Sequence, residues 1–205
     1  MKPHPADAPL MASGTSPWRH LPNALTALRM LLVVPLAWLI NDGDYRRALA
    51  VAAFAGATDA FDGLIAKRYG WQSWLGGILD PIADKLMLLA CFVSLGMIDA
   101  HPGWLTALVI GRDVVIVAGA VAYHHWIGRL HAQPLLLSKV TTVVQIVYVL
   151  AQLVRLTRTY EQPLLVSALM WATVALTVAS GIQYVVIWSA KARAELRRGG
   201  ARDGA

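Results

Sequence analysis

The chain has 205 residues, of which 57% are hydrophobic and 15% are charged, and its net charge is +6. Soluble domains average about 45–50% hydrophobic and about 25% charged residues, so this composition excludes a disordered chain and favours a membrane protein. The single cysteine, Cys91, excludes a disulfide scaffold. No basic amphipathic helix or nucleic-acid motif accompanies the positive charge, so we expect no nucleic-acid partner.

Six hydrophobic segments of the sequence are predicted to be transmembrane helices, because a helix needs roughly 20 apolar residues to cross a bilayer core. They cover residues 22–40, 46–66, 76–98, 103–123, 135–156 and 163–189. The breaks between them contain turn-forming sequences such as Asn41-Asp42-Gly43-Asp44 and His101-Pro102-Gly103. We therefore predict the all-α fold class, in the form of a polytopic membrane protein with six transmembrane helices.

The six helices are predicted to form one domain, residues 22–190. Residues 1–21 are expected to form an interfacial or flexible segment, and residues 191–205 a basic, flexible tail. If both termini face the cytoplasm, ten Lys and Arg residues flank the spans on that side and four on the other. Because cytoplasmic loops carry the excess of basic residues, we expect both termini to face the cytoplasm. The expected location of the protein is a bacterial inner membrane.

Four aspartates lie in the second and third predicted helices, where a charge at the helix centre costs about 2.5–3.5 kcal/mol on insertion scales. Asp59 and Asp62 share one face of the second helix, and Asp80 and Asp84 share one face of the third. The short connecting loop predicts that the two helices are antiparallel neighbours. The two pairs of carboxylates can therefore face each other near the cytoplasmic end.

Converging carboxylates repel one another unless cations neutralise them. No cysteine and no suitably spaced histidine joins them, so the ligands would all be oxygen atoms, which favours Mg²⁺ or Mn²⁺. Two ions suit four carboxylates, and paired ions suit displacement at phosphorus. Lys67 and Arg68 follow the first pair and would lie beside the anionic oxygens of a diphosphate.

The same residues spell a longer pattern, Asp59-Ala-Phe-Asp62-Gly63-Leu-Ile-Ala66-Lys67, followed after eight residues by Gly76 and then by Asp80 and Asp84. It resembles the signature of the CDP-alcohol phosphotransferases, D-x-x-D-G-x-x-A-R, eight residues, G-x-x-x-D-x-x-x-D, at seven of its eight fixed positions. The departure is Lys67, where the family has Arg. Because Lys lacks the bidentate guanidinium, Arg68 is the alternative holder of the phosphate.

The resemblance implies the six-helix CDP-alcohol phosphotransferase fold and an enzyme that cleaves a CDP-linked lipid and releases CMP. It implies that Asp59, Asp62 and Asp80 are metal ligands. Asp84 resembles the general base that takes the proton of the acceptor hydroxyl, and it would also touch the second metal. A homodimer, with its active site on the cytoplasmic side, is expected from the resemblance as well.

Positions that resemble the family's nucleotide-binding residues lie in the first three predicted helices and directly after the second. The first helix opens with Pro22-Asn23, Thr26 and Arg29, similar to the P-N-x-x-T-x-x-R opening of phospholipid-synthesising members. The expected CDP-binding residues are Asn23, Thr26, Gly63, Ala66, Lys67, Arg68 and Gly76.

Arg112 and Lys139 lie at membrane depth in later helices and are predicted to bind the acceptor phosphate; the alternative for Arg112 is pairing with Asp113. The sequence Ser138-Lys139-Val140-Thr141-Thr142, followed by Gln145, has Thr141 where phosphatidylglycerophosphate synthases carry a second Lys. It is more similar to the CMP-forming cardiolipin synthases of the family. We therefore expect CDP-diacylglycerol as donor and phosphatidylglycerol as acceptor, with glycerol 3-phosphate as the alternative acceptor.

Three other hypotheses account less well for the carboxylates. Simple ion pairing between helices, with Lys85, Arg112 or Arg29, would not require four aspartates at this regular spacing. A prenyltransferase also uses Asp-rich membrane motifs, but it needs two separate ones. A cation transporter or channel leaves the glycine and alanine positions of the signature unexplained.

Overall fold

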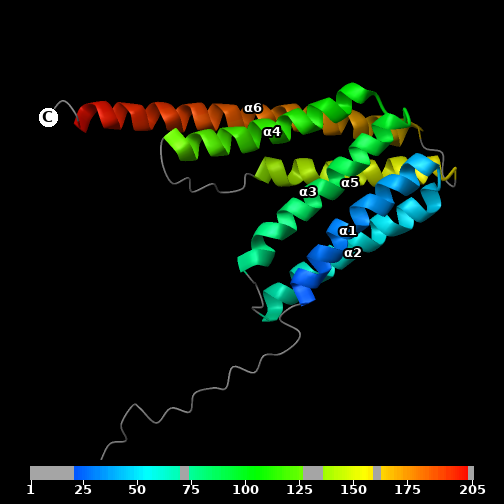
Figure 1. The fold of residues 1–205 in the computed structure, drawn as a ribbon. Coiled ribbons are helices and arrows are strands. Elements are labelled where there is room, and N and C mark those ends of the chain that lie inside the picture. Colours follow the sequence, from blue (N-terminus) through cyan, green and yellow to red (C-terminus); the bar gives the residue numbers. More distant parts are fainter. Residues whose placement is uncertain (1–20, 70–73, 127–135, 159–162, 203–205) are drawn as a thin grey trace, which may run out of the picture.

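The computed structural model describes residues 21–69, 74–126, 136–158 and 163–202, and within them every regular element is an α-helix. The helices are α1 (Leu21–Asp42), α2 (Tyr45–Tyr69), α3 (Trp74–Met97), α4 (Gly103–Trp126), α5 (Leu136–Leu156) and α6 (Pro163–Arg202) (Figure 1). Each of the six hydrophobic segments corresponds to one helix, so the predicted all-α fold class is confirmed.

Four helices contain stretches that are long and apolar enough to cross a membrane, judged over the described residues. The stretches are Leu25–Asp42, Gly103–Ala122, Leu136–Leu156 and Pro163–Lys191. Large apolar side chains stand on their outer faces, for example Leu31 at 71% and Leu164 at 83% exposure. Such faces are stable against lipid rather than water, and the chain is an integral membrane protein.

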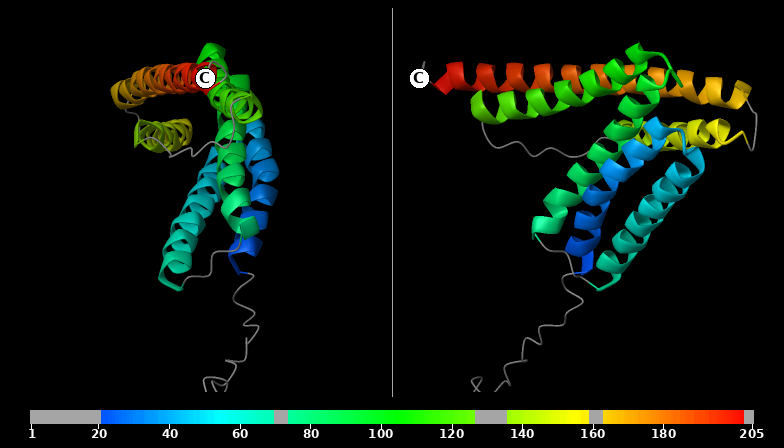
Figure 2. Two further views of the ribbon diagram at one scale, coloured as in Figure 1. Left: turned by 90° about the vertical axis from the view of Figure 1, so that its left-hand side faces the viewer. Right: turned by 45° about the vertical axis from the view of Figure 1, so that its right-hand side comes forward.

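The six helices form two groups of three. Helices α2 and α3 both pack on α1, while α4 and α5 both pack on α6. Figures 1 and 2 show that the long axes of the two groups cross one another. The groups meet where α2 packs on α5 and where α3 packs on α4 and α5. Consequently α1, α2, α5 and α3 form a ring. In their described parts α2 and α3 make no direct contact with each other, and each packs on α1 and on α5.

The turn between α1 and α2 shows why a helix ends where the sequence predicts it. Gly43 has a φ of +84°, a conformation that favours glycine. The Asp44 amide donates to the carbonyl of Leu39 at 3.0 Å, which closes α1 in the manner of a Schellman motif. The Asp44 carboxylate then accepts from the Arg47 amide at 3.1 Å and caps α2.

The main apolar core lies at the end of the molecule away from the signature residues. Leu36 and Ile40 of α1 pack there with Phe92 and Leu95 of α3 and with Tyr148 of α5, all at 0% exposure. This core fixes α1, α3 and α5 at one end of the ring. Toward the other end of α1 and α3, the described contacts include two polar pairs, Thr26 with Asp80 and Arg29 with Asp84.

Helix α6 continues to Arg202, whereas the sequence predicts a flexible tail from residue 191. The segment after Ser189 contains Ala, Lys, Arg, Glu and Leu, all strong helix formers. The Arg193 guanidinium also donates to the carbonyl of Ser189 at 3.1 Å. The charge pattern that ends a membrane span therefore does not end the helix.

Candidate active site

The signature is divided between two helices, and the structure describes side chains for only part of it. Asp80 and Asp84 of α3 are described, as are Thr26 and Arg29 of α1. The other predicted site residues of α1–α3 lie in helices, but their side chains lie outside the described residues; they are Asn23, Asp59, Asp62, Gly63, Ala66, Lys67, Arg68 and Gly76. The predicted convergence of four carboxylates therefore stays a prediction.

Asp80 is held from α1 by a threonine. Thr26 is 2% exposed, and its hydroxyl donates to Oδ1 of Asp80. Both residues sit near the start of parallel helices that pack closely along their length. A hydroxyl partner fixes the rotamer of a carboxylate and adds no counter-charge beside it.

Asp84, one turn further along α3, forms an ion pair with Arg29, one turn further along α1. The pair joins Nη1 of Arg29 to Oδ1 of Asp84. The Arg29 side chain is 5% exposed, whereas the Asp84 side chain is 43% exposed. A buried guanidinium in an apolar helix needs such a partner, and the pairing fixes the orientation of the more accessible carboxylate.

A cavity of about 660 Å³ lies inside the ring of α1, α2, α3 and α5. Alanine and glycine residues of α2, among them Ala52, Ala53 and Gly56, leave the space for it. Its charged lining residues, among those described, are Arg29, Asp84, Lys85 and Asp113, and Thr142 and Gln145 add polar groups from α5. Of the two signature residues whose side chains are described, Asp84 lines this cavity of substrate size and Asp80 does not.

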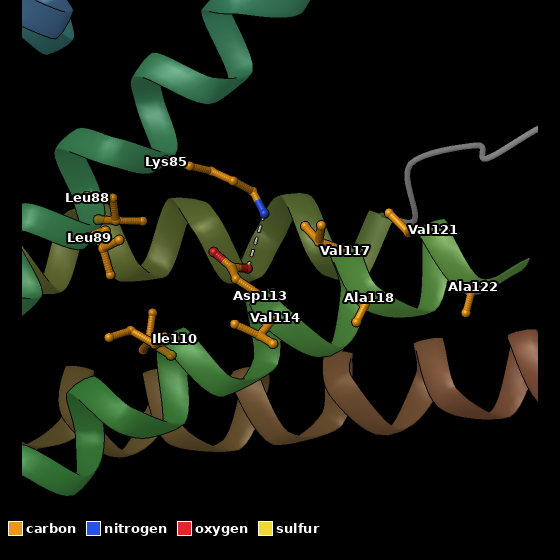
Figure 3. A pocket seen from close by; sticks show the side chains of 11 residues that line it. Lys85, Leu88, Leu89, Ile110, Asp113, Val114, Val117, Ala118, Val121 and Ala122 are labelled. Atoms are coloured by element: carbon orange, nitrogen blue, oxygen red, sulfur yellow. Dashed lines mark ion pairs between the residues drawn. The ribbon is translucent and has the colours of Figure 1, made fainter. Parts of the chain in front are cut away.

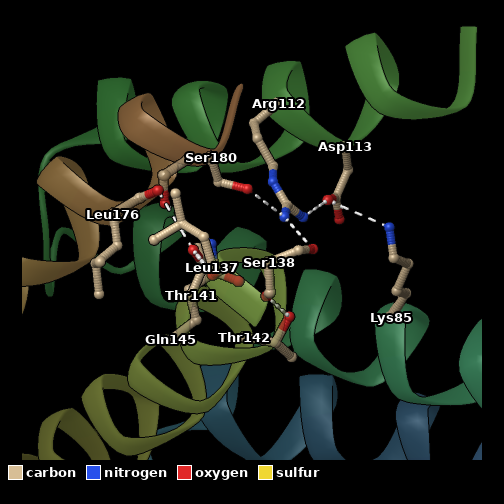
Figure 4. Close-up of polar contacts among 11 residues, drawn as sticks. Lys85, Arg112, Asp113, Leu137, Ser138, Thr141, Thr142, Gln145, Leu176 and Ser180 are labelled. Atoms are coloured by element: carbon tan, nitrogen blue, oxygen red, sulfur yellow. Dashed lines mark hydrogen bonds and ion pairs between the residues drawn. The ribbon is translucent and has the colours of Figure 1, made fainter. Parts of the chain in front are cut away.

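Arg112, predicted to bind the acceptor phosphate, is used to join helices. Its side chain is 5% exposed, and its Nη1 lies 2.6 Å from Oδ1 of Asp113. Its Nη2 donates to Ser138 of α5 at 2.6 Å and to Ser180 of α6 at 2.8 Å (Figure 4). Arg112 is absent from the described lining of the cavity. The geometry therefore favours the alternative, in which Arg112 pairs with Asp113.

The motif of α5 that contains Lys139 has some residues bonded to α6 and one that is exposed. Thr141 is fully buried, with its hydroxyl 2.8 Å from the Leu137 carbonyl and 3.3 Å from the Leu176 carbonyl of α6. Gln145 donates to Thr177 of α6 at 3.1 Å and also lines the cavity. Lys139 itself is exposed and lies outside the described cavity lining.

Lys85 and Asp113 are charged cavity residues that were not predicted as site residues. Nζ of Lys85 lies 3.2 Å from Oδ1 of Asp113, and both side chains line the cavity. The sequence offers a signal for each of them, because Lys85 directly follows Asp84 and Asp113 is an acid within an apolar helix. That signal cannot show that the two residues meet.

Two of the four predicted metal ligands are described, and their carboxylates are of the kind that a hard divalent cation prefers. Asp80 and Asp84 lie on one face of α3, and each is oriented by a side chain of α1. No group of three potential metal ligands occurs among the described side chains, a search that does not cover Asp59 and Asp62. The donor set is thus all oxygen as far as it is described.

Comparison with known proteins identifies a family that the chain matches over most of its length. The family model for CDP-alcohol phosphatidyltransferase matches residues 19–179. The human CMP-forming cardiolipin synthase is 34% identical over 196 residues, which is 88% of this chain and 64% of the relative. A chloroplastic CDP-diacylglycerol–glycerol-3-phosphate 3-phosphatidyltransferase of Oryza sativa is 33% identical over 198 residues, 86% of this chain and 59% of the relative.

A probable phosphatidylglycerophosphate synthase of Mycobacterium tuberculosis is 34% identical over 181 residues, 81% of this chain and 80% of the relative. The chain therefore spans less than two thirds of the length of the human cardiolipin synthase and of the rice relative, and most of the length of the mycobacterial one. A cardiolipin synthase and a probable phosphatidylglycerophosphate synthase match at the same identity, so sequence similarity does not separate these two types of enzyme.

Proposed function

The chain belongs to the CDP-alcohol phosphatidyltransferase family, and on that premise we propose that it transfers the phosphatidyl group of CDP-diacylglycerol to phosphatidylglycerol, giving cardiolipin and CMP. The acceptor hydroxyl oxygen attacks the phosphatidyl phosphorus, and a new P–O bond forms. The P–O bond to CMP breaks, and CMP leaves with the electron pair. Asp84 takes the proton of the hydroxyl.

The observation that carries the choice of acceptor is the charge balance of the cavity. Its described lining has two cations, Arg29 and Lys85, and two anions, Asp84 and Asp113. Each cation is already paired with one of these carboxylates. A phosphodiester with one negative charge suits such a lining better than glycerol 3-phosphate, whose phosphomonoester carries about two.

The position of Thr141 supports the same choice. Phosphatidylglycerophosphate synthases resemble this chain here but carry Lys at that position. Thr141 is buried against α6, with its hydroxyl engaged by carbonyl oxygens. A lysine there would have to be buried or to displace α6, so this position supplies no cation to an acceptor phosphate.

The signature carboxylates would hold Mg²⁺ or Mn²⁺, two ions in all, and the ions would neutralise charge on the diphosphate when bound. Within the chain, Thr26 and Arg29 orient Asp80 and Asp84, and Arg29 keeps the proton-accepting carboxylate pointed at the cavity. We assign CDP binding to the remaining signature positions, with Lys67 or Arg68 on a phosphate. Lys139 is retained as a candidate for the acceptor phosphate.

We further propose that α2 and α3 also span the membrane, which makes six spans, that both termini face the cytoplasm of a bacterial cell, and that the chain forms a homodimer. The odd-numbered helices α1 and α3 run parallel, as alternating spans require. The positive-inside excess supports the orientation.

The test is CMP release by the purified full chain in liposomes that contain CDP-diacylglycerol and Mg²⁺, with phosphatidylglycerol or glycerol 3-phosphate offered separately. Cardiolipin formation from phosphatidylglycerol is the expected result. Turnover with glycerol 3-phosphate alone would show a different acceptor for the same chemistry. This second function is supported by the mycobacterial relative, which is as identical as the human one and is covered over 80% of its length.

A further inference from the structure

A second hollow lies outside the ring, between α3 and α4. This α3–α4 groove has a volume of about 690 Å³ and is lined mainly by leucine, isoleucine, valine and alanine (Figure 3). Val114, Val117 and Val121 on its α4 wall are 58%, 56% and 63% exposed. In an integral membrane protein such exposed apolar residues face lipid, so the groove opens to acyl chains rather than to water.

One end of the groove is charged. Among its described lining residues only Lys85 and Asp113 carry charge, and both also line the catalytic cavity, together with Leu88. The Lys85–Asp113 ion pair therefore stands where the lipid-facing groove and the catalytic cavity adjoin. Its side chains are 48% and 33% exposed, so the pair is accessible from outside.

The ion pair is also asymmetric. Asp113 has a closer and better buried partner, because Nη1 of Arg112 lies 2.6 Å from its Oδ1, compared with 3.2 Å for Nζ of Lys85. If Lys85 turned to another anion, Asp113 would keep Arg112 as its counter-charge. Lys85 can thus exchange partners without leaving the Asp113 carboxylate unpaired.

We propose that the acceptor phospholipid enters through the α3–α4 groove, with an acyl chain along α4 and its phosphodiester bound by Lys85 in place of Asp113. This inference rests on the proposed function, since it requires an acceptor that is a lipid. Its support is charge complementarity between Lys85 and a phosphodiester, and the continuity of an apolar, lipid-open groove with the cavity that holds Asp84.

The first test blocks the groove. Val117→Trp places a large ring in it, and Val186→Trp is the matched control, because Val186 is a similarly exposed valine of α6, 59% against 56%, away from the groove. Half-saturating mole fractions of phosphatidylglycerol and of CDP-diacylglycerol are measured in the same liposomes. We expect Val117→Trp to raise the value for phosphatidylglycerol by about tenfold, with the value for CDP-diacylglycerol and the unfolding temperature as in the control.

The second test removes the cation. Lys85→Met should also raise the half-saturating mole fraction of phosphatidylglycerol about tenfold, and Lys85→Arg should restore most of the loss, because a guanidinium still binds a phosphodiester. Equal values for Val117→Trp and its control would overturn the inference, as would an increase confined to CDP-diacylglycerol, which would assign the groove to the donor. Wild-type protein that makes no cardiolipin from phosphatidylglycerol would overturn the proposed function itself, before any variant is compared.

Discussion

The two three-helix groups both place polar side chains in apolar helices, but they use them differently. In α1–α3 two buried polar residues of α1 hold carboxylates of α3: Thr26 bonds to Asp80, and Arg29 pairs with Asp84, which is 43% exposed at a cavity. In α4–α6 several buried polar residues instead bond to side chains or carbonyls of neighbouring helices. Arg112, Ser180, Thr141 and Gln145 are buried and bonded between helices.

The difference shows that a polar residue at membrane depth is not by itself a sign of a binding site. Without a hydrophobic driving force between helices in lipid, interhelical hydrogen bonds and small residues supply the association. The second group follows that rule, with Ser138, Thr177 and Ser180 as partners. What distinguishes the first group is that its buried arginine, Arg29, itself lines the cavity, whereas Arg112 is absent from the described lining.

The largest effect on activity is expected from a substitution of Asp84 in the first group. Asp84→Asn retains an oxygen that can accept from Arg29 but cannot take a proton from the acceptor hydroxyl. We expect the rate of CMP release to fall by about 10²–10⁴-fold, while CDP binding, measured by isothermal titration, is largely kept. Normal turnover in this variant would remove Asp84 as the base.

Arg112→Met should show that the second group is structural. The substitution removes a buried charge that holds α4 to α5 and α6, and we expect a loss of about 3 kcal/mol in the free energy of unfolding, measured by thermal unfolding in detergent. Ser180→Ala, which removes one of its hydrogen bonds, should cost less. A rise in the half-saturating acceptor fraction with unchanged unfolding would instead make Arg112 a phosphate-binding residue.

Thr141 offers a smaller change in the same group. Thr141→Val keeps the shape of the side chain and removes its hydrogen bonds, so we expect about 1 kcal/mol of destabilisation and an unchanged choice of acceptor. Thr141→Lys should destabilise the chain more, without creating activity toward glycerol 3-phosphate. New activity of that kind would show that this position reaches the acceptor.

The smallest expected effect concerns His101, which lies between α3 and α4 and packs against Phe92 and Tyr148. Thr106 donates to the Phe92 carbonyl at 3.0 Å, so the His101 ring must donate to Thr106 from Nε2, at 2.8 Å. Burial lowers the pKa of His101 below its ordinary 6.5. The unfolded chain then binds a proton more readily than the folded chain.

Stability should therefore be greatest above pH 6.5 and should fall as the pH drops from 6.5 toward the lowered pKa, below which it levels off. Unfolding temperatures measured between pH 7.5 and pH 5 should show this decline in the wild type. The decline should be weaker in His101→Gln, and an identical profile in the two proteins would contradict the assignment.

The sequence by itself determined the membrane class, the six helices and the signature. Hydropathy and turn chemistry are local properties, so segments such as 103–123 and the turn at Gly43 follow from neighbouring residues alone. The extent of α6 was harder to predict, because basic residues that end a span do not end a helix.

The tertiary structure decided the partner of each polar residue. Arg29 and Arg112 are both buried arginines of apolar helices, yet Arg29 lines the cavity beside Asp84, whereas Arg112 is absent from the described lining and joins three helices. Lys85 and Asp113, separated by 28 positions in sequence, meet at the boundary of two hollows. Such pairings depend on how each helix is rotated and packed against distant ones, and the spacing within one helix carries no information about that rotation.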